Sequence, residues 1–162
     1  MNSNKQTISE TLKKLPEHLY AILDSARNEE ILEYVFLSKA KYEILYDDKY
    51  KYELASVGPY LVNLKKNQNL IDTLIHKGWS DHWGIYLTSD CTFEELKEHF
   101  QQFLIVQMEN NEKLFFRFYD PRVLRVYLNS CTPEEKKSFF GPVSGYYLED
   151  LDNNNMLTIL SE

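Results

Sequence analysis

Two aspartates stand where a reactive site would be expected. Asp24 ends the apolar segment HLYAILD (residues 18–24), and Asp120 ends LFFRFYD (residues 114–120). Each is followed by a segment of helical character. In open α/β sheets the carboxyl ends of strands form the ligand crevice, so two acids there can act as metal ligands or as an acid/base pair. An aspartate before a helix is also a preferred N-cap, which stabilises the helix by about 0.5–2 kcal/mol.

Arg117 bears on that choice because it lies among aromatic residues just before Asp120. On a strand, Arg117 and Tyr119 would share one face, opposite Phe118. Burying an unpaired guanidinium costs several kcal/mol, so Arg117 needs a nearby acid or an exposed face. If the strands that carry Asp24 and Arg117 are neighbours, a bidentate ion pair can join the sheet to the helix ends. We favour this structural interpretation, in which Arg117 is a brace and Asp120 begins a helix.

The other reactive side chains form no recognisable site. The 4 histidines show no close pair and no HExxH or CxxC context. The 5 glycines are scattered, without a GxGxxG or GxxxxGK phosphate loop. Cys91 and Cys131 are interpreted as reduced thiols, and Ser144 as a turn serine rather than a nucleophile. We therefore expect no catalytic residue, no metal and no cofactor.

Composition indicates a folded single domain. The chain has 162 residues, of which 43% are hydrophobic and 14% aromatic, too apolar for a disordered protein. The formal charge of −7 argues against binding to phosphate backbones, so no nucleic-acid partner is expected. The sequence shows neither a secretory signal nor a run of 18 apolar residues, so we expect a cytoplasmic protein without a membrane partner.

Strand-like and helical segments alternate along the chain. The predicted strands cover 18–24, 41–46, 58–64 and 83–89, with a hairpin at 105–110 and 113–118. The predicted helices cover 26–40, 67–78, 92–104 and 121–130, and a further helix starts after Thr132. This order predicts an α/β fold with a mixed central sheet of about five to six strands flanked by helices. Residues 1–17 are expected to form an N-terminal arm, irregular or loosely helical, residues 18–150 the single domain, and residues 151–162 a C-terminal tail.

Three motifs together resemble a known family. They are LFFRFYDPRVL (114–124), GPYL (58–61) upstream and FFGPVSGYYLED (139–150) downstream. In this order they are similar to the bacterial type VI secretion effector chaperones, or adaptors, a domain long described as of unknown function. The resemblance covers residues 18 to about 150, and RFYDPRV followed by FFGP is its most specific part.

The resemblance implies a non-enzymatic cytoplasmic adaptor. Members recognise a toxic effector before secretion and help load it onto the VgrG spike, so the implied partners are an effector and VgrG. The signature positions carried over, which we expect to be mostly architectural, are Asp24, Gly58, Pro59, Arg117, Tyr119, Asp120, Pro121, Arg122, Phe140, Gly141 and Pro142. Many members continue past FFGP into a helical lobe implicated in effector contact, whereas this sequence stops at Glu162. The resemblance therefore places neither the effector surface nor the oligomeric state.

Exposed tyrosines are the expected contact residues, because tyrosine is enriched at protein interfaces. The candidates come from YDDKYKYE (46–53) and GYYLED (145–150), and are Tyr46, Tyr50, Tyr52, Tyr146 and Tyr147. The alternative is that they are ordinary loop tyrosines. Two other functions stay open: a small metal-dependent hydrolase that uses Asp24 and Asp120, and an immunity protein that binds and inhibits a toxin domain.

Overall fold

A six-stranded antiparallel sheet forms the centre of the protein. The computed structural model describes residues 3–16, 18–65 and 67–161. Within them the strand order is β2-β3-β1-β4-β7-β8, and every neighbouring pair is antiparallel. The strands are β1 (His18–Asp24), β2 (Tyr42–Ile44), β3 (Pro59–Asn63), β4 (Gly84–Ser89), β7 (Val143–Glu149) and β8 (Met156–Leu160). A separate two-stranded sheet pairs β5 (Ile105–Gln107) with β6 (Lys113–Phe115).

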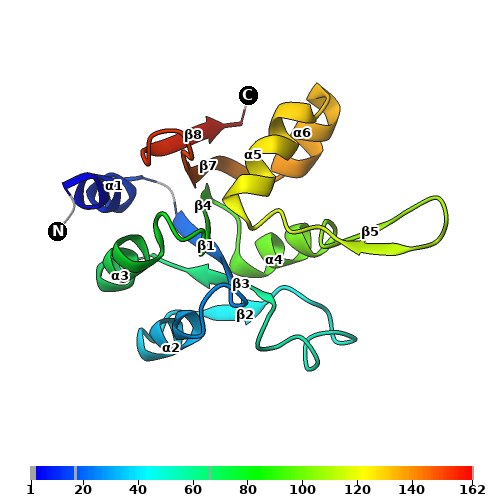
Figure 1. Ribbon diagram of the computed structural model, residues 1–162, viewed down its shortest axis with the longest axis horizontal. Helices are drawn as coiled ribbons and strands as arrows, with labels where there is room; N and C mark the ends of the chain where they lie inside the picture. The colour runs from blue at the N-terminus through cyan, green and yellow to red at the C-terminus, as the bar shows by residue number, and fades with distance from the viewer. Residues whose placement is uncertain (1–2, 17, 66, 162) are drawn as a thin grey trace.

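Helices cover both faces of the central sheet (Figure 1). They are α1 (Ser3–Lys13), α2 (Glu30–Leu37), α3 (Gln68–Gly78), α4 (Phe93–Gln101), α5 (Pro121–Ser130) and α6 (Pro133–Phe140). One core cluster joins α4, α5 and α6 to the side chains of Ile22, Leu87 and Tyr146. The other joins α1, α2 and α3 to the opposite side chains of the same strands, such as Ala21 and Tyr147. Because both faces are buried, the central strands are continuous apolar runs rather than alternating ones.

The predicted α/β fold class is confirmed, but the sheet is not mixed. The hairpin β5–β6 stands apart from the central sheet instead of extending it, and no parallel pair occurs among the described strands. Strand β1 has the predicted bounds and pairs antiparallel with both β3 and β4. The alternation of strands and helices therefore does not produce the parallel crossovers that this pattern usually indicates.

The starts of α4, α5 and α6 follow the sequence signals closely. Thr92 with Glu95 and Thr132 with Glu135 each form a capping box at the start of α4 and α6. Asp120 caps α5, and Pro121 occupies the first turn. These predicted starts are confirmed. By contrast, α2 was predicted from residue 26 but begins at Glu30 with Glu29 at its N-cap position, so Asp24 does not cap it.

The two ends of the chain are more ordered than expected. Of the predicted arm, residues 3–13 form α1, which buries Ile8 and Leu12, while residues 1, 2 and 17 lie outside the described residues. The predicted tail, whose residue 162 also lies outside them, contributes β8, which pairs with the unpredicted strand β7. In the part of the chain that is described, no helix combines the length and apolarity needed to span a bilayer.

Candidate functional site

Charged residues from distant parts of the sequence lie together at one end of the central sheet, where β1 and β7 end and β3 and β4 begin. Because the sheet is antiparallel, β1 ends at the edge where β3 and β4 begin, and the register pairs Asp24 with Pro59 and Leu23 with Gly84. Strand β7 ends at the same edge with Glu149. The backbone N–H of Asp24 donates to the Trp83 carbonyl at 2.8 Å and fixes the loop before β4. We refer to this region as the polar edge.

Asp24 and Arg117 form an ion pair across the polar edge. The Asp24 side chain is 1% exposed, and its Oδ2 accepts a hydrogen bond from Arg117 Nη2 at 2.5 Å. This hydrogen bond raises the pKa of the Arg117 guanidinium. The predicted pairing is confirmed, but it uses one nitrogen rather than two. Strand β6 ends at Phe115, so Arg117 lies on a loop and not, as predicted, on a strand.

Asp120 and Arg122 form a second pair, within the first turn of α5. Asp120 is 3% exposed, and its Oδ1 accepts from the Arg122 backbone N at 2.9 Å and from Nε at 3.0 Å, while Oδ2 accepts from Nη2 at 2.6 Å. Burial raises the pKa of Asp120, but the hydrogen bonds from Arg122 outweigh it and hold the pKa below its ordinary value. The predicted role of Asp120 as a helix cap is confirmed.

Asp24, at the end of β1, and Asp120, at the start of α5, are therefore each held by a separate arginine. Among the described residues, no group of three histidine, cysteine, aspartate or glutamate side chains has a geometry suited to a metal ion. The polar edge thus provides charge pairs that fix backbone segments, as the structural interpretation of Asp24 and Asp120 expects.

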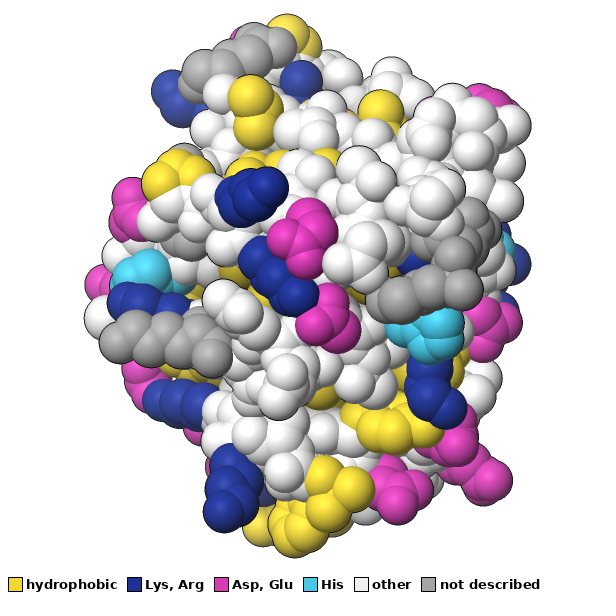
Figure 2. Space-filling view, turned by 90° about the vertical axis from the view of Figure 1, so that its left-hand side faces the viewer, with side chains coloured by type: hydrophobic (Ala, Val, Ile, Leu, Met, Phe, Trp, Pro, Cys, Tyr) yellow, Lys and Arg dark blue, Asp and Glu magenta, His cyan; other side chains and the backbone are white. Residues whose placement is uncertain are grey.

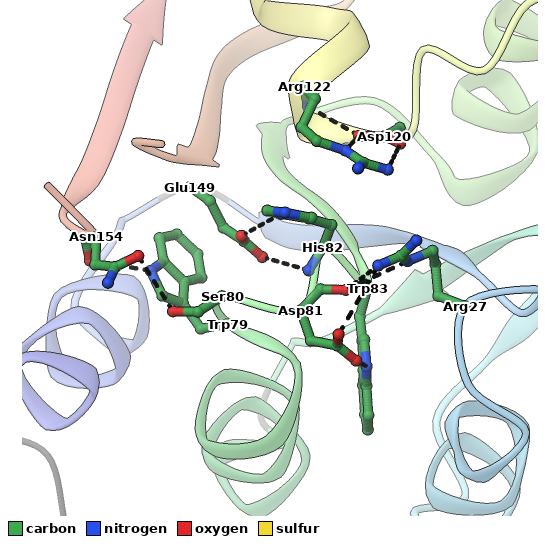
Figure 3. A network of polar contacts seen from close by, with 10 residues as sticks. All are labelled: Arg27, Trp79, Ser80, Asp81, His82, Trp83, Asp120, Arg122, Glu149 and Asn154. Atoms are coloured by element: carbon green, nitrogen blue, oxygen red, sulfur yellow. Dashed lines mark hydrogen bonds and ion pairs between the residues drawn. The ribbon is translucent and has the colours of Figure 1, made fainter. Parts of the chain in front are cut away.

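A third charged contact at the polar edge joins Glu149 to the loop before β4 (Figure 3). It was not predicted from the sequence. Glu149 is 4% exposed; its Oε2 lies 2.7 Å from His82 Nδ1, and its Oε1 accepts from the His82 backbone N at 3.1 Å. Burial raises the pKa of the Glu149 carboxyl, and the contacts with His82 offset this only in part. In the same loop the Asp81 carbonyl accepts from Arg27 Nε and Nη2 at 3.3 and 3.1 Å. The polar run Ser80–His82 between two tryptophans was the available signal.

The glycines and prolines of the signature mark places where the backbone passes close to other atoms. A Cβ on Gly58 would lie 2.8 Å from Ile44 Cδ1, and the Gly58 carbonyl accepts from Ser25 Oγ at 2.8 Å. Pro59 then begins β3. Gly58 and Pro59 therefore fix the path of the backbone where it passes the end of β1 and enters β3.

The FFGP motif has the same architectural character. Gly141 ends α6 with φ of +48°, a conformation that favours glycine, and a Cβ there would lie 2.3 Å from His99 Cε1. Phe140 is buried, and the Pro142 carbonyl accepts from Ser89 Oγ at 2.6 Å. The motif therefore joins α6 to the sheet.

A family model described as "Domain of unknown function (DUF4123)" matches residues 19–138. The chain belongs to the DUF4123 family. No curated protein and no solved structure matches the chain. The matched region includes both arginine–aspartate pairs and Gly58-Pro59, and it ends before Phe140.

The predicted contact tyrosines of this DUF4123 domain divide into buried and exposed residues. Tyr146 and Tyr147 are 0% and 5% exposed, because β7 lies inside the sheet and is covered on both faces. The prediction that they are exposed contact residues is wrong. Tyr46 is also buried, whereas Tyr50 is half-buried and Tyr52 is 82% exposed.

Tyr119 is likewise a core residue. It is 3% exposed, and burial first, then Tyr46, raises the pKa of its hydroxyl. With Phe118 also buried, the expected division of this segment into two strand faces is wrong, because the chain has already left β6. Tyr46 and Tyr119 are therefore neighbouring buried tyrosines of the core.

The β5–β6 hairpin of the DUF4123 domain exposes a group of apolar side chains. Val106, Met108, Leu114 and Phe115 are between 44% and 51% exposed. The Phe115 ring meets Tyr46 and Tyr50 edge-to-face, with centroids 5.7 and 5.9 Å apart. Tyr46 also lines two hollows of about 370 and 290 Å³, whose linings include none of the four exposed hairpin residues. Val106 and Leu114 lie opposite each other on one face of the hairpin, whereas Phe115 lies on the other face, against Tyr50. We call the exposed residues of both faces, Tyr50, Val106, Met108, Leu114 and Phe115, the hairpin surface.

The left-hand side of Figure 1 forms another face of the molecule, which Figure 2 shows from the front. Figure 2 shows acidic and basic side chains intermixed over it, with hydrophobic side chains gathered mainly at its lower end, where α2 lies in Figure 1. The exposed hydrophobic residues of α2 are Phe36 and Leu37. Among the described residues on this face, the basic side chains do not form an extended area of the kind that phosphate backbones attract.

Proposed function

We propose that this chain is a cytoplasmic adaptor of the type VI secretion system that binds a cognate toxic effector and helps load it onto the VgrG spike, and that it is not an enzyme. Membership of the DUF4123 family supports this proposal. So does the resemblance of RFYDPRV and FFGP to the motifs of bacterial effector adaptors. The observation that carries it is the contrast between signature arginines paired with buried aspartates and an apolar hairpin left exposed.

The signature arginines are engaged within the chain. Arg117 binds Asp24, and Arg122 binds Asp120 through two side-chain nitrogens. Both aspartates are buried, so neither carboxylate is displayed to a partner. Recognition of an effector by this chain would then use other side chains, and the two arginine–aspartate pairs would serve to hold the scaffold.

The hairpin surface has the composition of a protein interface. Aromatic residues and methionine are enriched at interface cores, and a few such residues usually carry most of the binding free energy. Phe115 is 49% exposed and rests on Tyr46 and Tyr50, so it is rigid enough to act as an anchor at low cost in entropy. On α2, Phe36 and Leu37 are also exposed, but neither has a ring partner among the described residues. We therefore place the effector contact on the hairpin surface.

Co-expression with the effector encoded by the adjacent gene tests the proposal. We expect a complex that survives affinity capture and size exclusion, with a Kd measurable by calorimetry. Phe115→Ala should weaken effector binding at least tenfold, because truncating an interface anchor typically costs about 1–3 kcal/mol. Phe36→Ala is the matched control, since Phe36 is 69% exposed on another element, and it should leave Kd unchanged.

Two results would contradict the proposal at different levels. Capture of neither the effector nor VgrG by the wild-type chain would remove the adaptor function. Equal affinities for Phe115→Ala and wild type, with equal melting temperatures, would remove only the hairpin surface.

An immunity protein would also bind the toxin, so a strain that lacks this gene must be compared with the wild-type strain. Loss of an adaptor blocks delivery of the effector, whereas loss of an immunity protein kills the producing cell.

A further inference from the structure

Strand β8 leaves one side of its backbone unpaired. It is the last strand of the central sheet and is hydrogen-bonded only to β7 (Figure 1). Its five residues, MLTIL, contain no charge and no proline. A strand edge of this kind is a template for pairing with another extended chain.

The register shows which backbone groups face outward. The Ser161 N–H donates to the Ser144 carbonyl, and the Asp150 N–H donates to the Asn155 carbonyl, so these opposite residues are hydrogen-bonded pairs. In an antiparallel ladder such pairs alternate. Leu157 and Ile159 must therefore also point their backbone groups at β7. The N–H and C=O groups of Met156, Thr158 and Leu160 point away from the sheet, and none of them has a hydrogen-bond partner among the described residues.

The opposite edge of the sheet is protected, which makes the β8 edge distinctive. Strand β2 is only three residues long and includes Glu43, which forms an ion pair with Lys97. Lys41, just before β2, pairs with Glu94. Short strands and charged side chains are the usual devices that prevent edge-to-edge pairing. Strand β8 uses neither.

A trough runs beside β8 on the side of α5 and α6. Leu157 and Ile159 pack toward this side and, with Leu128 of α5, form the apolar part of a hollow of about 280 Å³. The rest of its lining is polar or charged: Arg125, Asn129, Lys136, Asp150 and Asp152. A second hollow of about 540 Å³ continues past the end of β8, between Ser161 and α6. The Lys136 side chain lines both hollows, so they are neighbours on this side of the molecule. A strand added to β8 would direct alternate side chains into this trough.

We propose that the β8 edge binds an extended segment of the effector by strand addition, with outward N–H and C=O groups of Met156, Thr158 and Leu160 pairing to the effector backbone. Alternate apolar side chains of that segment occupy the trough beside Leu157 and Ile159. Main-chain hydrogen bonds supply affinity in this mode, and the side-chain hollows supply specificity. The inference rests on the proposed function for the identity of the partner.

A second copy of the chain is a poorer occupant of this edge. Pairing two β8 strands would by itself use five residues from each copy, fewer than the about 20–30 residues a side of a stable interface. An effector that is already bound at the hairpin surface needs only a short additional contact of this kind. The trough also extends beyond the end of β8, where it can receive side chains of a longer peptide. The edge and the hollows therefore match one continuous extended segment.

Amide hydrogen exchange tests the proposal without a mutation. In the free protein the amides of Leu157 and Ile159 should exchange slowly, and those of Met156, Thr158 and Leu160 quickly. Addition of the full-length effector should slow exchange at least tenfold at these three outward amides. If the effector binds and the three amides are unchanged, the strand-addition site is refuted while the adaptor function stands. If the effector does not bind at all, the proposed function itself has failed.

A pair of variants at one position separates backbone pairing from side-chain contact. Thr158→Pro removes an outward N–H that does not bond to β7, and proline is tolerated on strand edges of this kind. It should weaken effector binding at least tenfold, whereas Thr158→Val, which keeps the N–H, should change Kd less than twofold. Circular dichroism and melting temperature check that both variants fold; if Thr158→Pro does not, the exchange experiment decides.

Peptides that tile the effector sequence, and a matching set from VgrG, identify the occupant. Protection of the outward amides by an effector peptide with alternating apolar residues supports the proposal. Protection by VgrG peptides alone, or a wild-type dimer that Thr158→Pro dissociates in analytical ultracentrifugation, would overturn it.

Discussion

Replacing Arg117 by leucine is the most direct perturbation of the polar edge. It leaves the Asp24 carboxylate, which is 1% exposed, with only the hydrogen bond from the Ala26 backbone N at 3.1 Å among the described residues. Removing one partner of a fully buried ion pair costs about 3–5 kcal/mol, whereas an exposed pair contributes about 0–1 kcal/mol. The Arg117 side chain is 47% exposed, so water screens one side of the pair. We therefore expect Arg117→Leu to lower the free energy of unfolding by about 2–3 kcal/mol.

Urea unfolding followed by circular dichroism measures this loss, and a double-mutant cycle with Asp24→Asn assigns it. If the loss comes from a stranded carboxylate, Asp24→Asn in the Arg117→Leu background should restore about 1–2 kcal/mol relative to additivity. Arg125→Leu is the matched control. Arg125 binds Asp152, whose side chain is 74% exposed, and lies 3.6 Å from Asp150, whose side chain is 20% exposed, so neither carboxylate is as buried as Asp24 and the loss should be smaller than that of Arg117→Leu. Additivity of the two single variants within about 0.5 kcal/mol would refute the bracing role of the pair.

Three other substitutions test separate parts of the fold. Asp120→Ala should cost about 1–2 kcal/mol in urea unfolding, because it removes the cap of α5, and Asp120→Asn should cost less since it keeps an acceptor; equal losses would contradict capping. Tyr146→Ala should cost about 3–5 kcal/mol, because the ring is 0% exposed and stacks on Phe139; a variant of nearly wild-type stability would place Tyr146 outside the core. Burial lowers the pKa of His99, partly offset by its hydrogen bond to the Phe139 carbonyl, so the unfolded chain takes up a proton below about pH 6.5 that the folded chain resists. Wild-type stability should therefore fall more than that of His99→Gln between pH 7.5 and 5.5, and a parallel decline would contradict this linkage.

The elements that the sequence predicted well are those with local signals. Strand β1 is a short apolar run bounded by polar residues, and its bounds agree at both ends. The starts of α4 and α6 follow from a threonine and a glutamate three residues apart, whose contacts are independent of the rest of the chain. Strands β7 and β8 gave weaker signals, because β7 is buried on both faces and β8 is a five-residue run after a polar turn. Their roles depend on pairing between distant segments, which periodicity does not reveal.

The candidate site shows the same contrast between contacts that local sequence signals predict and contacts that depend on pairing of distant segments. The need of Arg117 for an acid was evident from its aromatic neighbours, and Asp24 was a visible candidate because it ends a strand. The pairing of Glu149 with His82 was not evident, since 67 residues separate them and the antiparallel order of β4 and β7 brings them together. The same order buries Tyr146 and Tyr147, which sequence position alone had suggested were surface residues.

The Arg117 pair also connects the scaffold to the proposed contact surface. Strand β6 ends at Phe115, the Phe116 N–H donates to the Leu104 carbonyl at 2.8 Å, and Arg117 binds Asp24 directly afterwards. The hairpin is therefore tied to the central sheet within two residues of its most exposed aromatic ring. A ring held this way loses little conformational entropy when it enters a partner's pocket. Under the proposed function, the pair between Arg117 and the buried Asp24 would hold this ring in place for the partner without touching the partner itself.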